Sequence, residues 1–382
     1  MKPGTAEIIG GGFGGLVAAI ALARRHWTVR LHERREAVDS EGYGIAVQRN
    51  MAAIFETFGV LEEVLAGGAR LDRRDSLDRH GRVLMSRPTE RSPYRVDRRH
   101  IVQVLAEEAR HAGVDLCFGS TVTEAQPDGR LMTADGQAFS ADLVVIANGV
   151  NSALRDESGL LTKRRLERDG AVRIAIPRLP DEIASAAIDG TPMIEAWADN
   201  RRVLYCPVDS GRFYVLLGSL AEDIEARATP IDPSVWSRSF PTLRHFFNRV
   251  ATEADWTQAR WAQYQTVTLR RWSTQKIAIL GDAAHAMPPY LAQGAGHAMM
   301  NGLGLAVALD AAPDLASGLA RWEQRERPLT DHTQRWTRLY GNTLFLPDPL
   351  KKLAIQAEQH IPWLARQYAR AANHLPTGCE KT

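Results

Sequence analysis

The sequence predicts an α/β fold, in which a Rossmann-like βαβ domain carries an inserted strand-rich domain and is followed by C-terminal helices. Three observations support this prediction. A glycine-rich loop follows the first strand, a second apolar strand near residue 280 ends in Gly-Asp, and runs rich in β-branched and aromatic residues lie between them. The chain has 382 residues, enough for about two domains.

The domain boundaries follow from these patterns. We expect the Rossmann-like domain to be discontinuous, the strand-rich substrate domain to lie within it, and a helical tail to end the chain. The Rossmann-like domain is assigned residues 1–70, 97–168 and 265–340, the substrate domain residues 71–96 and 169–264, and the tail residues 341–382. The charged stretch from Lys163 to Asp169 is typical of an exposed connection between the two domains.

Composition narrows the class of protein. Hydrophobic residues make up 45% and charged residues 24% of the chain, and the formal net charge is +2, so we expect no nucleic-acid partner. No apolar run approaches the roughly 18 residues of a membrane span, and no secretion signal is recognisable at the N-terminus. The three cysteines fit neither a metal site nor a redox pair. We therefore predict a cytoplasmic protein without a membrane partner.

The first motif is the loop Gly10-Gly11-Gly12-Phe13-Gly14-Gly15, between the strand at residues 6–9 and an Ala- and Leu-rich helix. Glycines permit a tight turn and let backbone amides approach a pyrophosphate, while the positive end of the helix faces that charge. Glu33 ends the next strand, where an acid can bind ribose hydroxyls. This combination predicts dinucleotide binding, but it does not distinguish NAD from FAD.

The second motif is the stretch from Ala147 to Arg155, which follows an apolar strand. A turn with a following serine and arginine could hold a further part of a cofactor. An ordinary Asn-Gly turn at Asn148-Gly149 explains the same residues equally well.

The third motif begins at Gly281-Asp282 and ends at Gly294-Ala295-Gly296. Asp282 follows a buried strand, where its carboxylate could bind polyol hydroxyls. Two prolines stiffen the loop, and small residues at the start of the next helix let a flat ring lie close to the backbone. The N-terminus of that helix could stabilise negative charge on a reduced flavin. This motif favours FAD over NAD.

With these motifs in this order, the chain resembles the single-component FAD-dependent aromatic hydroxylases, the p-hydroxybenzoate hydroxylase type. The likeness spans residues 6–340 and is strongest to the branch that oxygenates hydroxypyridine carboxylates. The stretches that carry this closer likeness are residues 29–33, 169–173, 204–207, 281–287, 291–296 and 322–328. The resemblance implies a glutathione-reductase-type FAD domain that binds FAD non-covalently.

The resemblance assigns cofactor contacts residue by residue. The ADP half of FAD would contact the glycine loop and the acid after the second strand, with one strand flanking the adenine. The flavin half would contact an arginine at a helix start and the third motif. These residues are Gly10, Gly12, Phe13, Gly14, Gly15, Glu33, Arg34, Arg98, Val122, Asp282, Pro288, Gly294, Ala295 and Gly296. Asn148 replaces the aspartate that is usual in the second motif, whereas Ser152 and Arg155 match it.

The substrate pocket is likewise assigned from the resemblance. Arg173 or Arg202 could clamp a carboxylate bidentately, and Tyr214 could hydrogen-bond a ring hydroxyl or nitrogen. Each of these side chains could equally be a structural residue of a strand. Ala46 and Arg74 stand where the similar enzymes have two further pocket tyrosines. The implied substrate is a related heteroaromatic or phenolic acid.

The implied reaction is a monooxygenation that consumes NADH or NADPH and O2. It passes through a flavin C4a-hydroperoxide and hydroxylates the ring, with or without ring opening. Two alternatives are a flavin-binding protein without oxygenase activity, which Asn148 favours, and an NAD-dependent dehydrogenase, which the third motif disfavours. No catalytic residue is assigned, because His285 and His297 are more simply structural. Neither histidine has partners at metal-ligand spacing, so no metal is expected. We expect a monomer or a homodimer.

Overall fold

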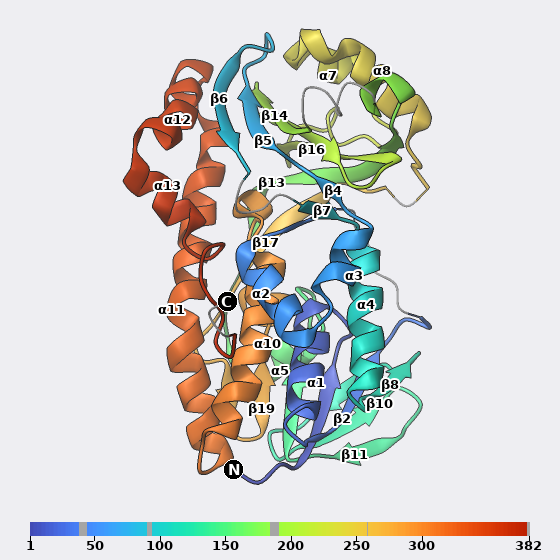
Figure 1. Cartoon of the computed structure of the whole chain (residues 1–382), viewed down its shortest axis with the longest axis vertical. Helices are drawn as coiled ribbons and strands as arrows, with labels where there is room; N and C mark the ends of the chain where they lie inside the picture. The colour runs from blue at the N-terminus through green and yellow to red at the C-terminus, as the bar shows by residue number, and fades with distance from the viewer. Residues whose placement is uncertain (38–43, 90–93, 184–190, 258, 380–382) are drawn as a thin grey trace.

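A computed structural model describes residues 1–37, 44–89, 94–183, 191–257 and 259–379. The described chain forms two large sheets, one in each half of the elongated molecule, with the long helix α11 (Leu315–Gly341) running beside the lower half (Figure 1). The lower half contains the N-terminal strand and both ends of the predicted Rossmann-like domain. The mixed α/β fold predicted from the sequence is confirmed.

The lower half is built on a six-stranded sheet with the order β18-β19-β12-β1-β2-β8. Five of its strands run parallel, and β18 is an antiparallel edge strand. The strand bounds are β1 Thr5–Ile9, β2 Thr28–Glu33, β8 Asp115–Phe118, β12 Leu143–Ile146, β18 Ser273–Thr274 and β19 Ile277–Ile279. Because the chain leaves this sheet after β12 and returns at β18, two stretches far apart in sequence build one sheet.

Alternation along β2 shows how the two faces of this sheet are covered. Val29 and Leu31 are buried in the core beside the helices α1 (Phe13–Ala23) and α4 (Arg98–His111). Arg30 and His32 point the other way and contact the ring of Phe139. Phe139 belongs to a small antiparallel sheet of β9 (Val122–Ala125), β10 (Arg130–Thr133) and β11 (Ala138–Ser140). Helices thus cover one face and the small sheet the other.

The upper half is built on a seven-stranded sheet with the order β17-β13-β16-β15-β14-β5-β6. Its bounds are β5 Arg73–Leu77, β6 Val83–Pro88, β13 Leu161–Pro177, β14 Pro192–Ala198, β15 Arg201–Pro207, β16 Arg212–Leu220 and β17 Ala262–Leu269. One face packs apolar side chains against α7 (Pro233–Ser239) and α8 (Arg244–Glu253). The opposite face carries most of the buried arginines and tyrosines of this half.

The stretch from Lys163 to Asp169 was wrongly expected to be an exposed connection. It is the first part of the 17-residue strand β13, which pairs with β17 along one edge and with β16 along the other. Lys163, Arg164 and Arg168 are exposed on both faces of the strand, because successive side chains point to opposite faces, while Asp169 is buried at an irregularity of the pairing. Charge here marks a strand segment that is solvated on both faces rather than a loop.

The remaining elements are a small sheet, further helices and short 3-10 turns. This second small sheet contains β3 (Ile45–Val47), β7 (Tyr94–Val96) and β4 (Ala69–Arg70). The other helices are α2 Arg49–Phe58, α3 Leu61–Ala66, α5 Ala153–Glu157, α9 Asp282–His285, α10 Gly294–Asp310, α12 Asp348–His360 and α13 Pro362–Ala369. Three short 3-10 turns are η1 Pro241–Leu243, η2 Pro289–Leu291 and η3 Asn342–Phe345. None of the described helices is long and apolar enough to cross a membrane.

Candidate active site

The glycine loop between β1 and α1 is held by close backbone contacts. Gly10 has φ of +112°, and a Cβ there would lie 2.6 Å from the carbonyl oxygen of Ala147. A Cβ on Gly15 would collide with the carbonyl oxygen of Gly10. Gly12 is different, because a Cβ there would meet no atom within 4 Å. The loop is therefore tight on its inner side and open at Gly12, the place where a pyrophosphate would approach the start of α1.

Glu33 lies beside this loop, as its position at the end of β2 predicts. Its Oε2 accepts a hydrogen bond of 2.7 Å from the backbone amide of Gly11, and its Oε1 accepts one from Arg35. A small hollow opens next to it, lined by Gly11, Glu33 and Phe118 among others. Arg34 is exposed next to the acid. The loop and the acid thus adjoin each other where β1 and β2 end, which is the place that the predicted role gives to the ADP half of FAD.

Val122 does not line that hollow. Its side chain is buried in the core of the lower half, at the start of β9. Ser120, two residues before Val122, donates a hydrogen bond from its backbone amide to the carbonyl oxygen of Glu33, and its hydroxyl contacts His32. Only the backbone near Val122 could therefore face a ligand, which is the role that the sequence suggested.

The second motif, from Ala147 to Arg155, contacts both the glycine loop and the third motif. The backbone of Asn148 lies against the glycine loop, since a Cβ on Gly10 would be 2.9 Å from its Cα. Ser152 caps α5 by accepting a hydrogen bond from the amide of Arg155. The buried guanidinium of Arg155 donates to the carbonyl oxygens of Val150, at 2.9 Å, and of Ala283, at 3.4 Å. Arg155 therefore fixes the turn after β12 against the third motif.

Asp282 lies where three elements meet. It begins α9 immediately after β19, and a Cβ on Gly294, at the start of α10, would lie 3.9 Å from its Oδ1. Arg98, the first residue of α4, acts on it electrostatically and lies with its guanidinium 5.0 Å from the centre of the Phe13 ring. The structure thus brings Phe13, Arg98, Asp282 and Gly294 together.

The pKa and the solvent exposure of Asp282 together indicate that its side chain lies in a hollow. Burial raises the pKa of its carboxyl, and Arg98 partly offsets this rise. The side chain is nevertheless exposed to solvent. Both observations hold if water enters a space that protein atoms enclose on most sides. A ligand that displaced this water and donated hydroxyl hydrogens would stabilise the carboxylate, as the ribityl chain of FAD does in the predicted role.

Three amide side chains near the start of α10 were not recognised in the sequence. Asn50 donates to Oε1 of Gln293 at 2.9 Å, and Gln293 donates to Gln48. Asn50 also lies against Gly296, whose Cβ would be 2.9 Å from Nδ2 of Asn50. Because Gln48 and Asn50 come from α2 and its N-cap, no local pattern pointed to them. They fix the N-terminal turn of α10, in which Ala295 packs partly against the core.

The loop between Asp282 and Gly294 also reaches the upper sheet. Pro288 accepts a hydrogen bond from Thr337 of α11 through its carbonyl oxygen. Two residues later, the ring of Tyr290 lies 5.9 Å from that of Tyr264 on β17 and 6.3 Å from that of Trp197 on β14. The predicted flavin-lining loop and the predicted substrate face of the sheet are therefore in contact.

Arg173 and Tyr214 lie on that face, on the neighbouring strands β13 and β16. The guanidinium of Arg173 is 5.5 Å from the centre of the Tyr264 ring. Burial alone would lower the pKa of Arg173, but Tyr264 and Tyr214 raise it. No carboxylate in the described part of the chain pairs with Arg173. Arg173 is thus a permanently charged, partly buried cation that an anionic ligand could neutralise.

Arg202 has a different environment. It forms an ion pair of 2.5 Å with Glu195 and lies over the rings of Trp197 and Tyr290, at 5.0 and 5.1 Å. Burial would raise the pKa of Glu195, but Arg202 and Arg74 hold it below its usual range. Arg202 is therefore already neutralised within the sheet, and Arg173 is the one of these two arginines that has no carboxylate partner among the described residues.

Arg74 extends this buried network to the C-terminal helices. It pairs with Glu195 at 3.0 Å and with Glu358 of α12 at 3.5 Å, and it donates to the hydroxyl of Tyr340. The arginine that replaces a pocket tyrosine of similar enzymes is thus a structural link between β5 and α12. Ala46 lies on β3, opposite Arg95.

Asp169 and Tyr290 form a further pair that the sequence did not reveal. The hydroxyl of Tyr290 donates to Oδ2 of Asp169, and both side chains are buried. Burial raises the pKa of Asp169 to about 6, although the Tyr290 hydroxyl and Arg202 favour its charged form. This pair joins the start of the pairing between β13 and β16 to the loop after Pro288.

The two histidines point into the packing between α10 and α11. His285 receives a contact of 2.9 Å from Asn301, and burial lowers its pKa to about 4. Nδ1 of His297 lies 3.1 Å from the hydroxyl of Thr330, and burial lowers the pKa of His297 well below its usual value. Both rings are therefore neutral in the folded protein, as expected of structural histidines. The described residues contain no group of three His, Cys, Asp or Glu side chains arranged to hold a metal.

A glycine loop, an acid at the end of β2 and a Gly-Asp loop, arranged in this way, are typical of an FAD-binding flavoprotein. A sequence model of the family described as "FAD binding domain" matches residues 5–329. The chain therefore belongs to this family, and the prediction of FAD as its cofactor is confirmed.

Individual relatives narrow the class. A 2-heptyl-3-hydroxy-4(1H)-quinolone synthase of Mycobacteroides abscessus is 36% identical over 87% of this chain and 89% of its own. A 3-amino-4-hydroxybenzoate 2-monooxygenase of Streptomyces cremeus is 27% identical over 96% and 95%. The solved structure of 2-methyl-3-hydroxypyridine-5-carboxylic acid oxygenase matches with a TM-score of 0.86 and 33% identity over 100% and 99%. The predicted likeness to aromatic hydroxylases, and to this branch of them, is confirmed, and the chain is an FAD-dependent aromatic monooxygenase.

The role of Glu33 can be tested by Glu33→Gln, which keeps the size of the side chain and removes its charge. We expect the dissociation constant of FAD to rise about 10- to 100-fold, the usual contribution of a hydrogen bond to a charged group. Quenching of FAD fluorescence on titration of the apoprotein measures this constant. Glu36→Gln, at an exposed acid three residues later, is the matched control. Equal constants for the wild type and Glu33→Gln would contradict the role.

The raised pKa of Asp169 predicts a pH dependence of stability. The folded protein keeps a proton on Asp169 up to pH of about 6, whereas the unfolded chain releases it near pH 3.9. The stability that this proton contributes at low pH is therefore lost as pH rises from about 4 to about 6. Asp169→Asn should reduce that loss by up to about 3 kcal/mol.

Urea denaturation at pH values across this range measures the effect. Asp310→Asn, at an exposed aspartate of α10, is the control and should follow the wild type. A wild-type loss that persists unchanged in Asp169→Asn would show that other groups cause it.

Proposed function

We propose that this protein uses NADH or NADPH and O2 to hydroxylate an oxygen-bearing aromatic ring, and that its substrate is a hydroxypyridine carboxylate or a related phenolic acid. The observation that carries this proposal is the contact between the Asp282–Gly294 loop and the sheet face that bears Arg173, Tyr214 and Tyr264. A ring bound on this face would lie beside the flavin. When bound and reduced, FAD supplies the activation of O2 and the transfer of one oxygen atom.

The chain's own residues supply binding and orientation. Arg173 is suited to the substrate carboxylate, because it carries a charge that no described carboxylate neutralises. Tyr214 and Tyr264 are suited to a ring hydroxyl or nitrogen, and the aromatic side chains of Trp197 and Tyr290 exclude water from one side. The route through a flavin hydroperoxide, the choice between hydroxylation and ring opening, and the role of Asn148 towards NAD(P)H stay predictions.

A 4-quinolone is the second candidate substrate. The ion pair between Arg202 and Glu195 favours it, because Glu195 already neutralises one of the two arginines that were candidates for a carboxylate clamp. The quinolone synthase relative is also similar over most of both chains. Hydroxypyridines and 4-quinolones share a ring nitrogen and a ring oxygen, and they differ in whether a carboxylate is present.

We also propose a cytoplasmic location, which the free state of Cys117, Cys206 and Cys379 supports.

Arg173→Gln distinguishes the two candidates. For a hydroxypyridine carboxylate, we expect KM to rise about 10- to 100-fold, because a hydrogen-bonded charge partner is lost. For a 2-alkyl-4-quinolone, KM should stay within about twofold, since no such charge pair forms. NAD(P)H oxidation by the FAD-loaded enzyme, with the product identified by mass spectrometry, measures both. Lys163→Gln, at an exposed residue of the same strand, is the control. An unchanged KM for the acid would contradict the role of Arg173.

A further inference from the structure

The C-terminal helices expose an unusual number of large apolar side chains. Among the described residues, eleven such side chains are exposed, and five of them lie between residues 339 and 363. These five are Leu339, Leu350, Leu353, Ile361 and Trp363, with exposed fractions of 46–61%. They come from the end of α11, from α12 and from the start of α13, which form the outer flank of the molecule (Figure 1). Scattered exposed apolar residues are ordinary, whereas a concentration of them marks an interaction surface.

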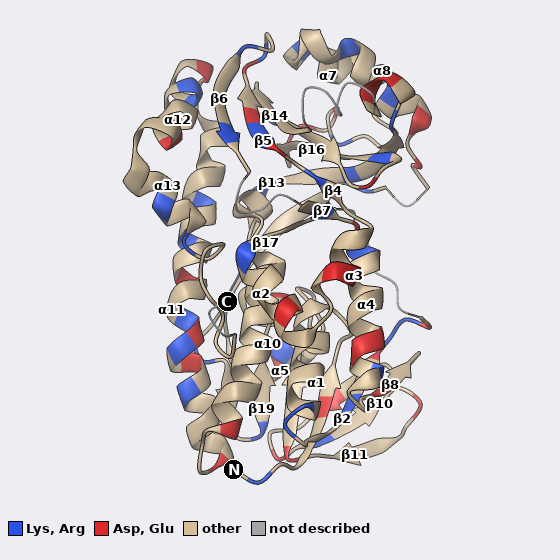
Figure 2. Ribbon diagram, viewed as in Figure 1, with Lys and Arg blue, Asp and Glu red and all other residues tan. Residues whose placement is uncertain are grey.

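The charged residues of the same segment are predominantly basic. Between residues 335 and 370, the residues Arg335, Arg338, Lys352, Arg366 and Arg370 are exposed. The two acids of this segment do not balance them. Asp348 pairs with Lys351, and the buried Glu358 pairs with Arg74 and Arg87. Blue positions accordingly recur along α13 and the adjoining part of α11 (Figure 2). We call the five apolar and five basic residues the C-terminal basic-apolar surface.

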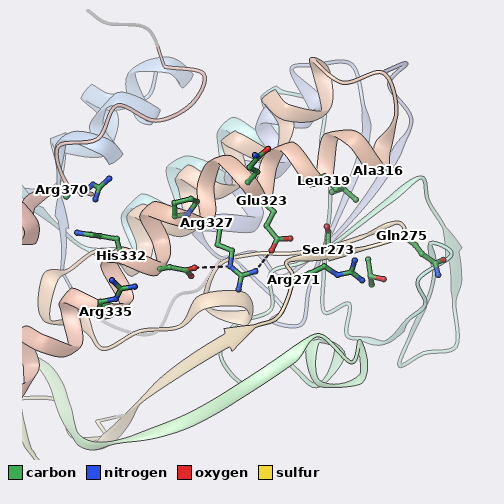
Figure 3. A pocket seen from close by; sticks show the side chains of 15 residues that line it. Arg271, Ser273, Gln275, Ala316, Leu319, Glu323, Arg327, His332, Arg335 and Arg370 are labelled. Carbon is green, nitrogen blue, oxygen red and sulfur yellow. Dashed lines mark hydrogen bonds and ion pairs between the residues drawn. The ribbon is translucent and has the colours of Figure 1, made fainter.

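A groove leads along α11 to this surface. It has a volume of about 1070 Å³, and its lining runs along one side of α11 from Ala316 to Arg335 (Figure 3). In its middle, Arg327 is neutralised by Glu323 at 2.5 Å and Asp331 at 3.3 Å. At its end, Arg335 and Arg370 have no carboxylate partner within the described residues.

The end of the groove is a cationic cluster. His332, Arg335 and Arg370 line the same end of the groove (Figure 3). Burial lowers the pKa of His332, and the charges of Arg370 and Arg335 lower it further. Nε2 of His332 is bonded to Gln367, while its Nδ1 is buried without a hydrogen-bond partner. Two uncompensated guanidinium groups at the mouth of a groove are suited to bind a phosphate group.

We propose that the C-terminal basic-apolar surface binds the face of an anionic lipid bilayer, with lipid phosphates at Arg335 and Arg370. Leucine, isoleucine and tryptophan side chains that emerge among arginines and lysines are the composition of a surface that inserts shallowly at a lipid interface. The inner leaflet of the cytoplasmic membrane is anionic, so charge and apolar contact act together. A second copy of the chain fits less well, because a twofold contact would place these like charges against each other. This proposal replaces the sequence-based expectation of a protein without a membrane partner, and it does not depend on the identity of the substrate.

Vesicle sedimentation tests the proposal with the FAD-loaded, full-length protein. We expect it to pellet with large unilamellar vesicles that contain phosphatidylcholine and about 30% phosphatidylglycerol, and to stay in solution with pure phosphatidylcholine. Salt at about 0.5 M should release it, because screening weakens the attraction. No pelleting with the anionic vesicles, or equal pelleting with both kinds, would overturn the proposal.

Two variants assign any binding to this surface. Leu353→Asp, and Arg366→Glu combined with Arg370→Glu, should each lower the partition coefficient about tenfold or more. Ile224→Asp, at a residue that is 74% exposed in the upper half, is the control and should bind like the wild type. Gel filtration of each variant detects the competing occupant. If the wild type is an oligomer that Leu353→Asp dissociates, the surface is a contact between copies and the lipid proposal is wrong.

Discussion

The glycine loop is in close contact with three other segments of the chain, and the rest of the site depends on this constraint. Gly10 lies against Ala147 and Asn148 at the end of β12, and Gly14 lies against Leu280 after β19 and Ala298 of α10. Gly302 of α10 in turn lies against the carbonyl oxygen of Gly14, at 2.7 Å from a notional Cβ. A side chain at any of these glycines would separate segments that must meet. The two halves of the FAD site, which come from opposite ends of the sequence, are joined in this way.

Polar contacts complete this arrangement. Arg155 joins the turn after β12 to Ala283, and Gln293 joins the start of α10 to Gln48 and Asn50. Each contact fixes the position of a loop, and residues next to that loop were expected to touch the cofactor. The loops are thereby positioned by the strand ends and helix starts that carry them, which is how a rigid scaffold orients a bound cofactor.

The cofactor half of the site could be predicted because its signals are local. Gly10–Gly15 followed by a helix, Glu33 at the end of a strand, and Asp282 after a buried strand each occupy a few consecutive residues. The substrate half could not be predicted in the same way. Whether Arg202 is free or paired depends on the register that places it opposite Trp197 and within reach of Glu195. Asp169 and Tyr290 are 121 residues apart in the sequence, and no periodicity links them.

The charges of Lys163–Asp169 correctly predicted a largely exposed stretch, but the prediction of a connecting loop was wrong. A strand segment that is solvated on both faces has the composition of a connection, and only its pairing with β17, about 100 residues later, makes it a strand. The same limit applies to the pair of arginines. Residue type and position made either arginine a candidate for the clamp, whereas Glu195 neutralises Arg202 and no carboxylate among the described residues pairs with Arg173.

The most direct test of the account is the source of the oxygen in the product. The FAD-loaded enzyme should be supplied with NAD(P)H, an oxygen-bearing aromatic substrate and ¹⁸O2, and the product analysed by mass spectrometry. The account predicts that NAD(P)H consumption rises with the substrate and that the product gains label from ¹⁸O2. Consumption of NAD(P)H without labelled product, for hydroxypyridine acids, phenolic acids and quinolones alike, would contradict it.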